Sequence, residues 1–254
     1  DTDTDTDTDT DTDTDTDTDT DTDTDTDTDT KTGSEKKQLV VATSPDFPPF
    51  ESLEGGEVVG IEVDILKKVA EKMGMELDLQ QMDFDSVIPG VQAGKFDVGM
   101  SGITVTDKRK ENVDFSSVYF MAAQAIVVTA DSGITGKADL EGKKVSVQTG
   151  TTAEEYCMGN GYEVLAFTAN NDAAAALTAG KVDAWVVDNE VALAMAPELG
   201  LTVLDEAMTS EPYAFAFQKG SELVAPFNEA LDALLADGTV EQIFQQYGVT
   251  YIAP

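Results

Sequence analysis

The sequence predicts an α/β fold built on mainly parallel sheets, and three observations support that class. Short apolar runs alternate with longer segments in which apolar residues recur every three or four positions, as in buried strands and amphipathic helices. The connections between these segments are short, and glycines follow most of the expected helices. Strands that alternate with helices in this way are typical of parallel sheets covered by helices.

The first half of the chain shows a strand–helix–strand–helix–strand order. We expect strands at residues 39–43, 76–81 and 96–100, and helices at residues 61–73 and 85–93. Residues 44–51 hold three prolines, which exclude a helix or a central strand and predict a stiff loop that buries Phe50 and presents Phe47. We expect Phe84 to stand just before its helix, at the carboxyl edge of the sheet, where open α/β sheets bind ligands.

The segment from Ser101 to Arg109, directly after the third strand, combines small, hydroxyl and basic side chains. Gly102 would let a ligand approach the backbone, and Thr104 offers both an N–H and an O–H. Thr106 is expected to cap a helix that begins beside it. The guanidinium of Arg109 matches the two oxygens of a carboxylate. A capped helix with a solvated arginine is the alternative.

A second unit follows. We expect strands at residues 125–129, 144–148, 163–167, 182–187 and 213–218. One helix is expected to start near residue 151, and four more are expected at residues 170–179, 190–195, 223–235 and 240–247. Thr151 and Thr152, each three residues before a glutamate, fit capping boxes. A helix start after a strand can bind an anion, although a plain capped helix is the alternative. Asp188 follows a buried strand and needs a partner there, either a ligand ammonium or the next helix.

Charge and composition exclude several functions. Fifteen Asp-Thr pairs at residues 1–30 hold 15 of the 50 acidic residues. The rest of the chain has 35 acidic residues against 15 Lys and Arg, so its net charge is −20. Nucleic acids and anionic membranes need a basic surface, so we expect neither as a partner. We predict that residues 1–37, the repeat and a polar linker, are a disordered acidic tail.

The chain has no histidine and one cysteine, Cys157. The lack of histidine removes the commonest general base and the usual zinc ligand, and we expect Cys157 to be a buried structural thiol. We therefore expect no catalytic residue, no metal and no cofactor. The sequence shows no signal peptide and no apolar run of about 20 residues that could span a membrane.

Seven stretches carry a resemblance to a known family. They are Phe47-Pro-Pro-Phe-Glu, Gly60-Ile-Glu-Val-Asp-Ile, Phe84-Asp-Ser-Val-Ile-Pro, Ser101-Gly-Ile-Thr-Val-Thr-Asp-Lys-Arg, Val113-Asp-Phe-Ser, Gln148-Thr-Gly-Thr-Thr and Gly180-Lys-Val-Asp-Ala-Trp-Val-Val-Asp. Over residues 39–249 the chain resembles the type II periplasmic solute-binding proteins, in the polar amino-acid family that serves ABC importers.

The resemblance implies a two-lobed periplasmic-binding-protein-like II fold. Each lobe would be a mainly parallel sheet flanked by helices, and two hinge strands would join the lobes. The implied boundaries are residues 38–119 plus 217–254 for the first lobe, residues 124–211 for the second, and residues 119–123 and 212–216 for the hinges.

The resemblance also implies that a free L-α-amino acid binds between the lobes. Its carboxylate would be held by Arg109, Thr104, Gly102, Thr151 and Thr152, and its ammonium by Asp188. Phe47 and Phe84 would enclose its side chain, with Ser44, Ser101 and Gln148 also in that part of the pocket.

These neutral side-chain groups favour a polar, uncharged ligand such as glutamine or cysteine. Asp46 or Glu51 could still reach a basic group, so arginine remains a possible ligand. The resemblance further implies a monomer outside the cytoplasm, periplasmic or extracellular, that meets the membrane subunits of an importer, with a lipid anchor as one option for the precursor.

Two alternative functions stay open. The same fold hosts dehydratases, for which Glu190 is the extra acid near Asp188, and it hosts sensor modules of receptors.

Overall fold

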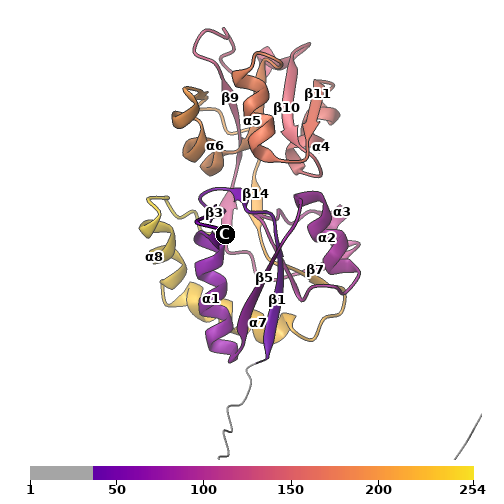
Figure 1. The fold of residues 1–254 in the computed structure, drawn as a ribbon, viewed down its shortest axis with the longest axis vertical. Coiled ribbons are helices and arrows are strands. Elements are labelled where there is room, and N and C mark those ends of the chain that lie inside the picture. Colours follow the sequence, from indigo (N-terminus) through magenta and orange to yellow (C-terminus); the bar gives the residue numbers. More distant parts are fainter. Residues whose placement is uncertain (1–36) are drawn as a thin grey trace, which may run out of the picture. The chain divides into compact units, whose positions relative to one another are not determined.

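The computed structural model describes residues 37–254. The repeat and linker at residues 1–36, which we predicted to be disordered, lie outside the described residues. The described part forms two lobes, each with a five-stranded sheet flanked by helices (Figure 1). This is the α/β architecture that the order of strands and helices predicted.

Lobe 1 is built on the sheet with the strand order β5-β1-β6-β15-β7. Its strands are β1 (Gln38–Thr43), β5 (Glu76–Gln81), β6 (Val98–Met100), β7 (Val113–Phe115) and β15 (Ala216–Gln218). Its helices are α1 (Ile61–Met73), α2 (Phe84–Gln92), α3 (Asp107–Lys110), α7 (Val224–Ala236) and α8 (Thr239–Gln246). Strand β1 pairs in parallel with β5 and β6, whereas β15 runs antiparallel between β6 and β7.

Lobe 2 is built on the sheet with the strand order β11-β10-β12-β9-β13. Its strands are β9 (Gln124–Val128), β10 (Lys144–Gln148), β11 (Glu163–Phe167), β12 (Ala184–Asp188) and β13 (Thr202–Val203). Its helices are α4 (Thr152–Gly159), α5 (Asn170–Thr178) and α6 (Asn189–Met195), with short 3₁₀ helices at Lys137–Leu140 and Pro197–Leu199. Strands β10, β11 and β12 are parallel, and β9 is antiparallel to β12.

A two-stranded antiparallel ribbon connects the two sheets. It consists of β8 (Phe120–Ala122), which leads toward lobe 2, and β14 (Glu211–Tyr213), which leads back. The single strand that we predicted at residues 213–218 is therefore wrong. Tyr213 pairs with Phe120 in the ribbon, whereas Ala216 pairs with Phe115 in lobe 1, so the segment must break between them.

Two predictions near the first helix also need correction. The proline-rich segment is not only loop, because β2 (Asp46–Phe47), β3 (Glu51–Glu54) and β4 (Glu57–Val59) form a small antiparallel sheet. The two adjacent prolines lie in the turn between β2 and β3, outside any strand. We predicted that Phe84 stands just before its helix, but Phe84 is the first residue of α2, and Asp83 occupies the cap position.

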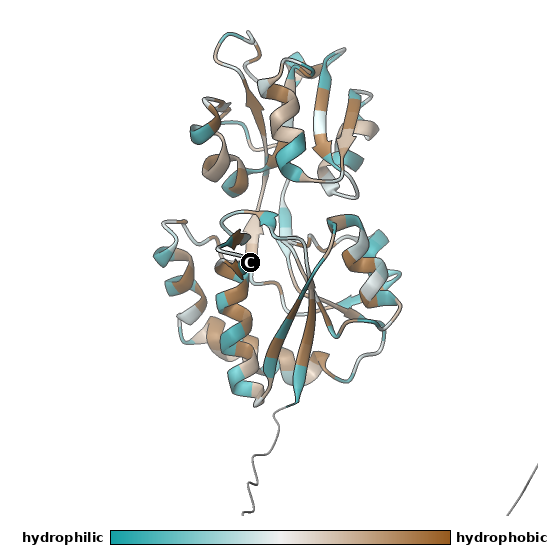
Figure 2. Ribbon diagram, viewed as in Figure 1, coloured by the Kyte–Doolittle hydropathy of each residue, from teal (hydrophilic) through white to brown (hydrophobic). Residues whose placement is uncertain are grey.

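The cores follow the hydrophobic pattern of the sequence (Figure 2). Phe50 is fully buried, as predicted, and packs edge-on against Tyr213 of the ribbon with ring centroids 5.1 Å apart. Cys157 is buried in lobe 2, and burial raises the pKa of its thiol to about 12. No helix within residues 37–254 combines the length and the apolar character that a membrane crossing requires.

Candidate functional site

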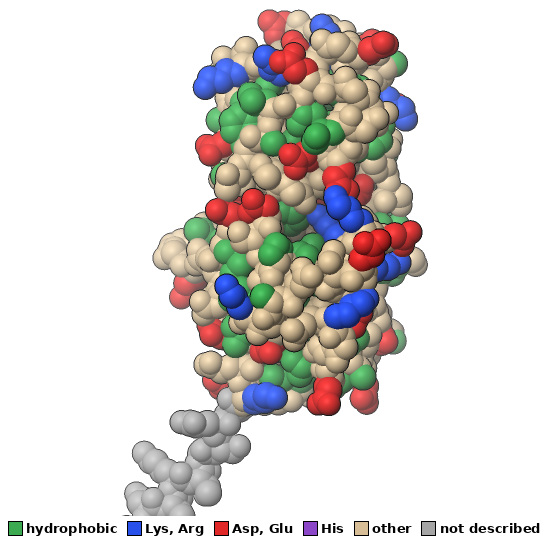
Figure 3. Space-filling model, turned by 90° about the vertical axis from the view of Figure 1, so that its right-hand side faces the viewer, with side chains coloured by type: hydrophobic (Ala, Val, Ile, Leu, Met, Phe, Trp, Pro, Cys, Tyr) green, Lys and Arg blue, Asp and Glu red, His purple; other side chains and the backbone are tan. Residues whose placement is uncertain are grey.

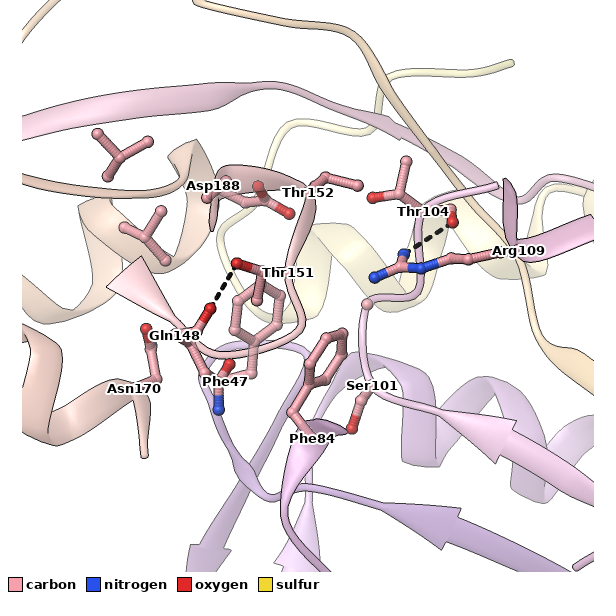
Figure 4. A pocket seen from close by; sticks show the side chains of 14 residues that line it. Phe47, Phe84, Ser101, Thr104, Arg109, Gln148, Thr151, Thr152, Asn170 and Asp188 are labelled. Carbon is pink, nitrogen blue, oxygen red and sulfur yellow. Dashed lines mark hydrogen bonds between the residues drawn. The ribbon is translucent and has the colours of Figure 1, made fainter. Parts of the chain in front are cut away.

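One pocket lies between the lobes and gathers most of the predicted residues (Figure 4). It is lined by Phe47, Phe84, Ser101, Gly102, Thr104, Arg109, Gln148, Thr151, Thr152, Ala153, Asn170, Val186, Val187 and Asp188. The centre of a water molecule can occupy about 20 Å³ of it, so the pocket is narrow.

The turn after β6 forms the lobe 1 side of the pocket. Gly102 has a positive φ of 53°, and a Cβ there would stand 2.6 Å from the ring of Phe47, so no other residue type fits the turn without displacing that ring. The Gly102 N–H donates to Glu62 Oε2 at 2.8 Å. The resemblance implied that the Gly102 backbone holds a ligand carboxylate, but the N–H of that backbone is engaged within lobe 1.

Arg109 reaches across the pocket from α3. Thr106 caps this four-residue helix, as predicted, by accepting from the Arg109 N–H at 3.1 Å. The Arg109 guanidinium donates to the carbonyl oxygen of Thr104 at 2.9 Å and to that of Gly150, in lobe 2, at 3.1 Å. It also lies 5.7 Å from the ring centre of Phe84. Two backbone carbonyls therefore hold the arginine in a defined orientation.

Burial lowers the pKa of Arg109, and the carboxylates of Glu155, Glu211 and Asp188 oppose that effect. An arginine keeps its charge in proteins at any ordinary pH. Of its five N–H donors, two are taken by the backbone carbonyls, so the guanidinium retains donors for a further acceptor.

The start of α4 forms the opposite side of the pocket. Thr151 accepts from the Glu154 N–H at 3.1 Å, while the Glu154 carboxylate accepts from the Gly150 N–H at 2.7 Å. The first bond of the capping box predicted for Thr151 is thus confirmed, whereas the return bond of Glu154 reaches the Gly150 N–H, one residue before the cap. The box predicted for Thr152 is wrong, because the Thr152 hydroxyl instead donates to Glu211 Oε2 at 2.9 Å.

Asp188 ends β12 inside the pocket and is buried. It makes no side-chain capping bond to α6 and instead accepts a hydrogen bond from the Tyr213 hydroxyl. Burial, together with the charges of Glu211 and Glu190, raises the pKa of Asp188 to about 8. The carboxyl group is thus costly to ionise until a cation comes close.

Among the predicted residues, Ser44 is the one that the pocket leaves out. Its backbone N–H donates to Ser101 Oγ at 2.7 Å and its hydroxyl donates to Asp46 at 3.1 Å, so it lines a neighbouring cavity. The sequence reasoning missed Asn170 as a pocket residue. Asn170 begins α5 directly after a strand of lobe 2, and the rule that placed Phe84 at a strand's carboxyl edge would have found it.

The surface around the site carries both charges. Figure 3 shows acidic and basic side chains interspersed on one face of the described residues. Lys108 of lobe 1 forms an ion pair with Glu155 of lobe 2. Glu190, the extra acid considered for a dehydratase, lines a different cavity with Leu193 and Tyr247.

Comparison with known proteins places the chain in a family. The model of the bacterial extracellular solute-binding proteins, family 3, matches residues 39–250. The arginine-binding extracellular protein ArtP of Bacillus subtilis is 36% identical over 226 residues, which cover 85% of this chain and 89% of that protein.

Solved structures agree. An ancestral arginine-binding protein bound to glutamine matches with a TM-score of 0.79 and 40% sequence identity, and the match covers 84% of this chain and 98% of that protein. An ancestral arginine-binding protein bound to arginine matches with a TM-score of 0.78 and 41% identity, over 84% of this chain and 99% of that protein. The ancestral amino acid-binding protein AncCDT-1, a precursor of cyclohexadienyl dehydratase, has a TM-score of 0.77 at 35% identity, with 83% and 95% covered. With a family model that spans nearly all of the two lobes, the chain belongs to family 3 of the bacterial extracellular solute-binding proteins.

Proposed function

We propose that this protein binds a free L-α-amino acid between its lobes and delivers it to an ABC importer. The observation that carries the proposal is a pair of opposite charges in one pocket. Arg109 enters from lobe 1 and Asp188 from lobe 2. An α-amino acid is a zwitterion, so its two charged groups match this pair.

In this proposal the ligand carboxylate binds Arg109, supported by Thr104 and by the Thr151–Thr152 start of α4. Arg109 is oriented by two backbone carbonyls, which lowers the entropy lost when it binds a carboxylate. Gly102 contributes close approach rather than its N–H, because that N–H donates to Glu62.

The ligand ammonium is proposed to bind Asp188. A cation beside this buried carboxyl group would compensate its desolvation and the repulsion from Glu211 and Glu190. The Tyr213 hydroxyl already holds one carboxylate oxygen, so the ammonium and the hydroxyl would share the charge. Asp188 would then be ionised in the complex although its pKa is about 8 without a cation.

The ligand side chain is proposed to lie between Phe47 and Phe84, toward Ser101, Gln148 and Asn170. These polar groups are neutral and favour an uncharged polar side chain, with glutamine as the first candidate. Arginine is the competing candidate, because the ancestral arginine-binding protein is described with both ligands. Ser44 is removed from this set by its place behind Ser101.

Lobe closure is proposed to occur about the ribbon of β8 and β14, which overlaps the hinge ranges 119–123 and 212–216. The corresponding lobes are residues 38–119 plus 217–254, and residues 124–211. Because groups for the ligand come from both lobes, the ligand would bind the closed form better and shift the equilibrium toward it. We further propose that the protein acts outside the cytoplasm as a monomer, with a lipid anchor in its precursor, and meets the importer's membrane subunits.

The test is a thermal-shift screen of the twenty amino acids, followed by calorimetry with glutamine and arginine. We expect stabilisation by a small set of L-amino acids, with glutamine at least as effective as arginine, and no effect of the D-enantiomers. The proposal fails if no amino acid raises the melting temperature.

A dehydratase is the second candidate, because AncCDT-1 is described as the precursor of such an enzyme. Asp188 has the raised pKa of a general acid, but Glu190 lines another cavity. We propose that the protein is not an enzyme. Turnover of a prephenate-like or arogenate-like compound, followed by the ultraviolet absorbance of an aromatic product, would overturn this assignment.

A further inference from the structure

One carboxylate of lobe 1 crosses to lobe 2 at the edge of the pocket. Asp46, in β2, accepts a hydrogen bond from the backbone N–H of Asn170 at 2.6 Å and from the Gln148 side-chain amide at 3.3 Å. The Asn170 side chain donates in turn to the Asp46 carbonyl oxygen at 3.3 Å. Protein atoms alone make this contact, so it does not depend on the chemistry of a ligand side chain.

The contact supplies something that α5 lacks. Asn170 is the first residue of this helix, and the residue at its cap position is Ala169, which makes no side-chain capping bond. The free N–H groups at a helix start favour an oxygen acceptor and a negative charge. Asp46 provides both from the other lobe, and it can do so only while the lobes are together.

Three protein donors hold the carboxylate of Asp46. Its Oδ2 accepts from the Asn170 N–H, its Oδ1 accepts from the Ser44 hydroxyl at 3.1 Å, and the Gln148 amide is shared between the two oxygens at 3.3 and 3.5 Å. These donors take most of the roughly four acceptor sites of a carboxylate, and Asp46 lines the neighbouring cavity rather than the pocket. A cationic ligand side chain would have to displace a protein donor to pair with Asp46.

Asp46 also determines how Gln148 faces the pocket. The Gln148 amide nitrogen donates both to Asp46 and to the carbonyl oxygen of Thr168 at 3.1 Å. Turning the amide over would bring its oxygen against these oxygens. The amide nitrogen is thus held at the Asp46 side, which leaves the amide oxygen for the pocket beside Phe47 (Figure 4).

We propose that Asp46 is a positioning residue that stabilises the closed form for every amino acid alike, and that it does not recognise the charge of the ligand side chain. The effect of Asp46 on amino-acid affinity rests on the proposed function. The effect of Asp46 on lobe closure does not, because its hydrogen bonds across the lobes involve no ligand. The two parts can therefore be tested separately.

The experiment compares wild type with Asp46→Ala in the full chain. Calorimetry gives the Kd for glutamine and for arginine, and spin labels at Lys95→Cys and Lys181→Cys, one exposed site in each lobe, give the distribution of interlobe distances. Cys157 is buried and its thiol has a raised pKa, so it does not compete for the label. We expect both Kd values to rise by a similar factor of about ten or more, and longer interlobe distances without ligand.

A loss that falls mainly on arginine would overturn the inference, because it would make Asp46 a counter-ion for the ligand. Unchanged interlobe distances would overturn it as well. If wild type binds neither amino acid, glutamine and arginine both fail as the ligand, and the distance measurement still decides whether Asp46 favours closure.

Two sets of controls isolate the contact. Asp83→Asn removes a charge from the cavity that Asp46 also lines, and Asp83 is exposed, so we expect less than a twofold change. Asn170→Pro deletes the N–H at a position where helices accept proline, and Ala169 already has the extended φ of −96° and ψ of 137° that precede proline.

Asn170→Ala is the matched variant that keeps the N–H. The inference requires that Asp46→Ala has its full effect on the Kd in the Asn170→Ala background and little further effect in the Asn170→Pro background. Equal effects in the two backgrounds would overturn it.

Discussion

Arg109 and Asp188 bring opposite charges into the same pocket, but the protein prepares them differently. Arg109 is held by two backbone carbonyls, one from each lobe. Asp188 is buried beside two other acids, with the Tyr213 hydroxyl as its hydrogen-bond donor. With the lobes together, Arg109 is thus a charge that is already oriented, whereas Asp188 is a carboxyl group that ionises readily only beside a cation.

This difference indicates which charged group of a bound zwitterion is recognised in a pH-dependent way. A guanidinium keeps its charge over any ordinary pH range, so carboxylate recognition should be constant with pH. A carboxyl group with a pKa of about 8 is mostly protonated below that pH, and there it must lose its proton when an ammonium binds. Ammonium recognition should therefore be coupled to proton release.

The largest expected effect comes from the arginine. Arg109→Ala leaves the ligand carboxylate desolvated without its main partner, so we expect a loss of roughly 2–5 kcal/mol in binding free energy. Calorimetry with glutamine measures it, and Lys110→Ala, an exposed basic residue on the same helix, is the control. Wild-type affinity in the Arg109→Ala variant would remove Arg109 from the site.

The next effect is a pH dependence that belongs to Asp188. Below its pKa of about 8, ligand binding must displace a proton, so the affinity should rise about tenfold per pH unit from pH 6 toward 8. Calorimetry in buffers with different ionisation enthalpies should show nearly one proton released per ligand at pH 6.5.

Asp188→Asn is the control for that linkage, and it should bind weakly with no pH dependence between 6 and 8. Glu211, Glu190, Tyr213 and Arg109 are the titratable groups that act on Asp188. A wild-type Kd that stays flat over this range, with no proton release, would contradict the linkage.

The contrast between the two charges also shows what local sequence patterns can predict. The helix at Ile61–Met73 and the strand at Glu76–Gln81 have the predicted bounds, because strong periodicity and a terminal glycine mark them. The split of residues 213–218 into β14 and β15 was not predictable, since it depends on pairing with two different, distant strands. The engagement of the Gly102 N–H depends in the same way on Glu62, which lies 40 positions earlier in the chain.

The smallest expected effect comes from the ion pair between Lys108 and Glu155, which joins the lobes at the surface. Both side chains are more than half exposed, so water and salt screen them, and such pairs contribute roughly 0.2–1 kcal/mol. Lys108→Ala should therefore raise the Kd by less than about fivefold, and high salt should abolish the difference.

Lys67→Ala is the matched control, because Lys67 pairs with Asp64 at 3.3 Å within one helix of lobe 1 and cannot affect closure. It should leave the Kd unchanged at every salt concentration. An effect of Lys108→Ala that reaches about 2 kcal/mol, roughly thirtyfold in Kd, and persists in high salt would place a surface pair beside Arg109 in importance. Closure would then depend on charges outside the pocket as much as on those that face the ligand.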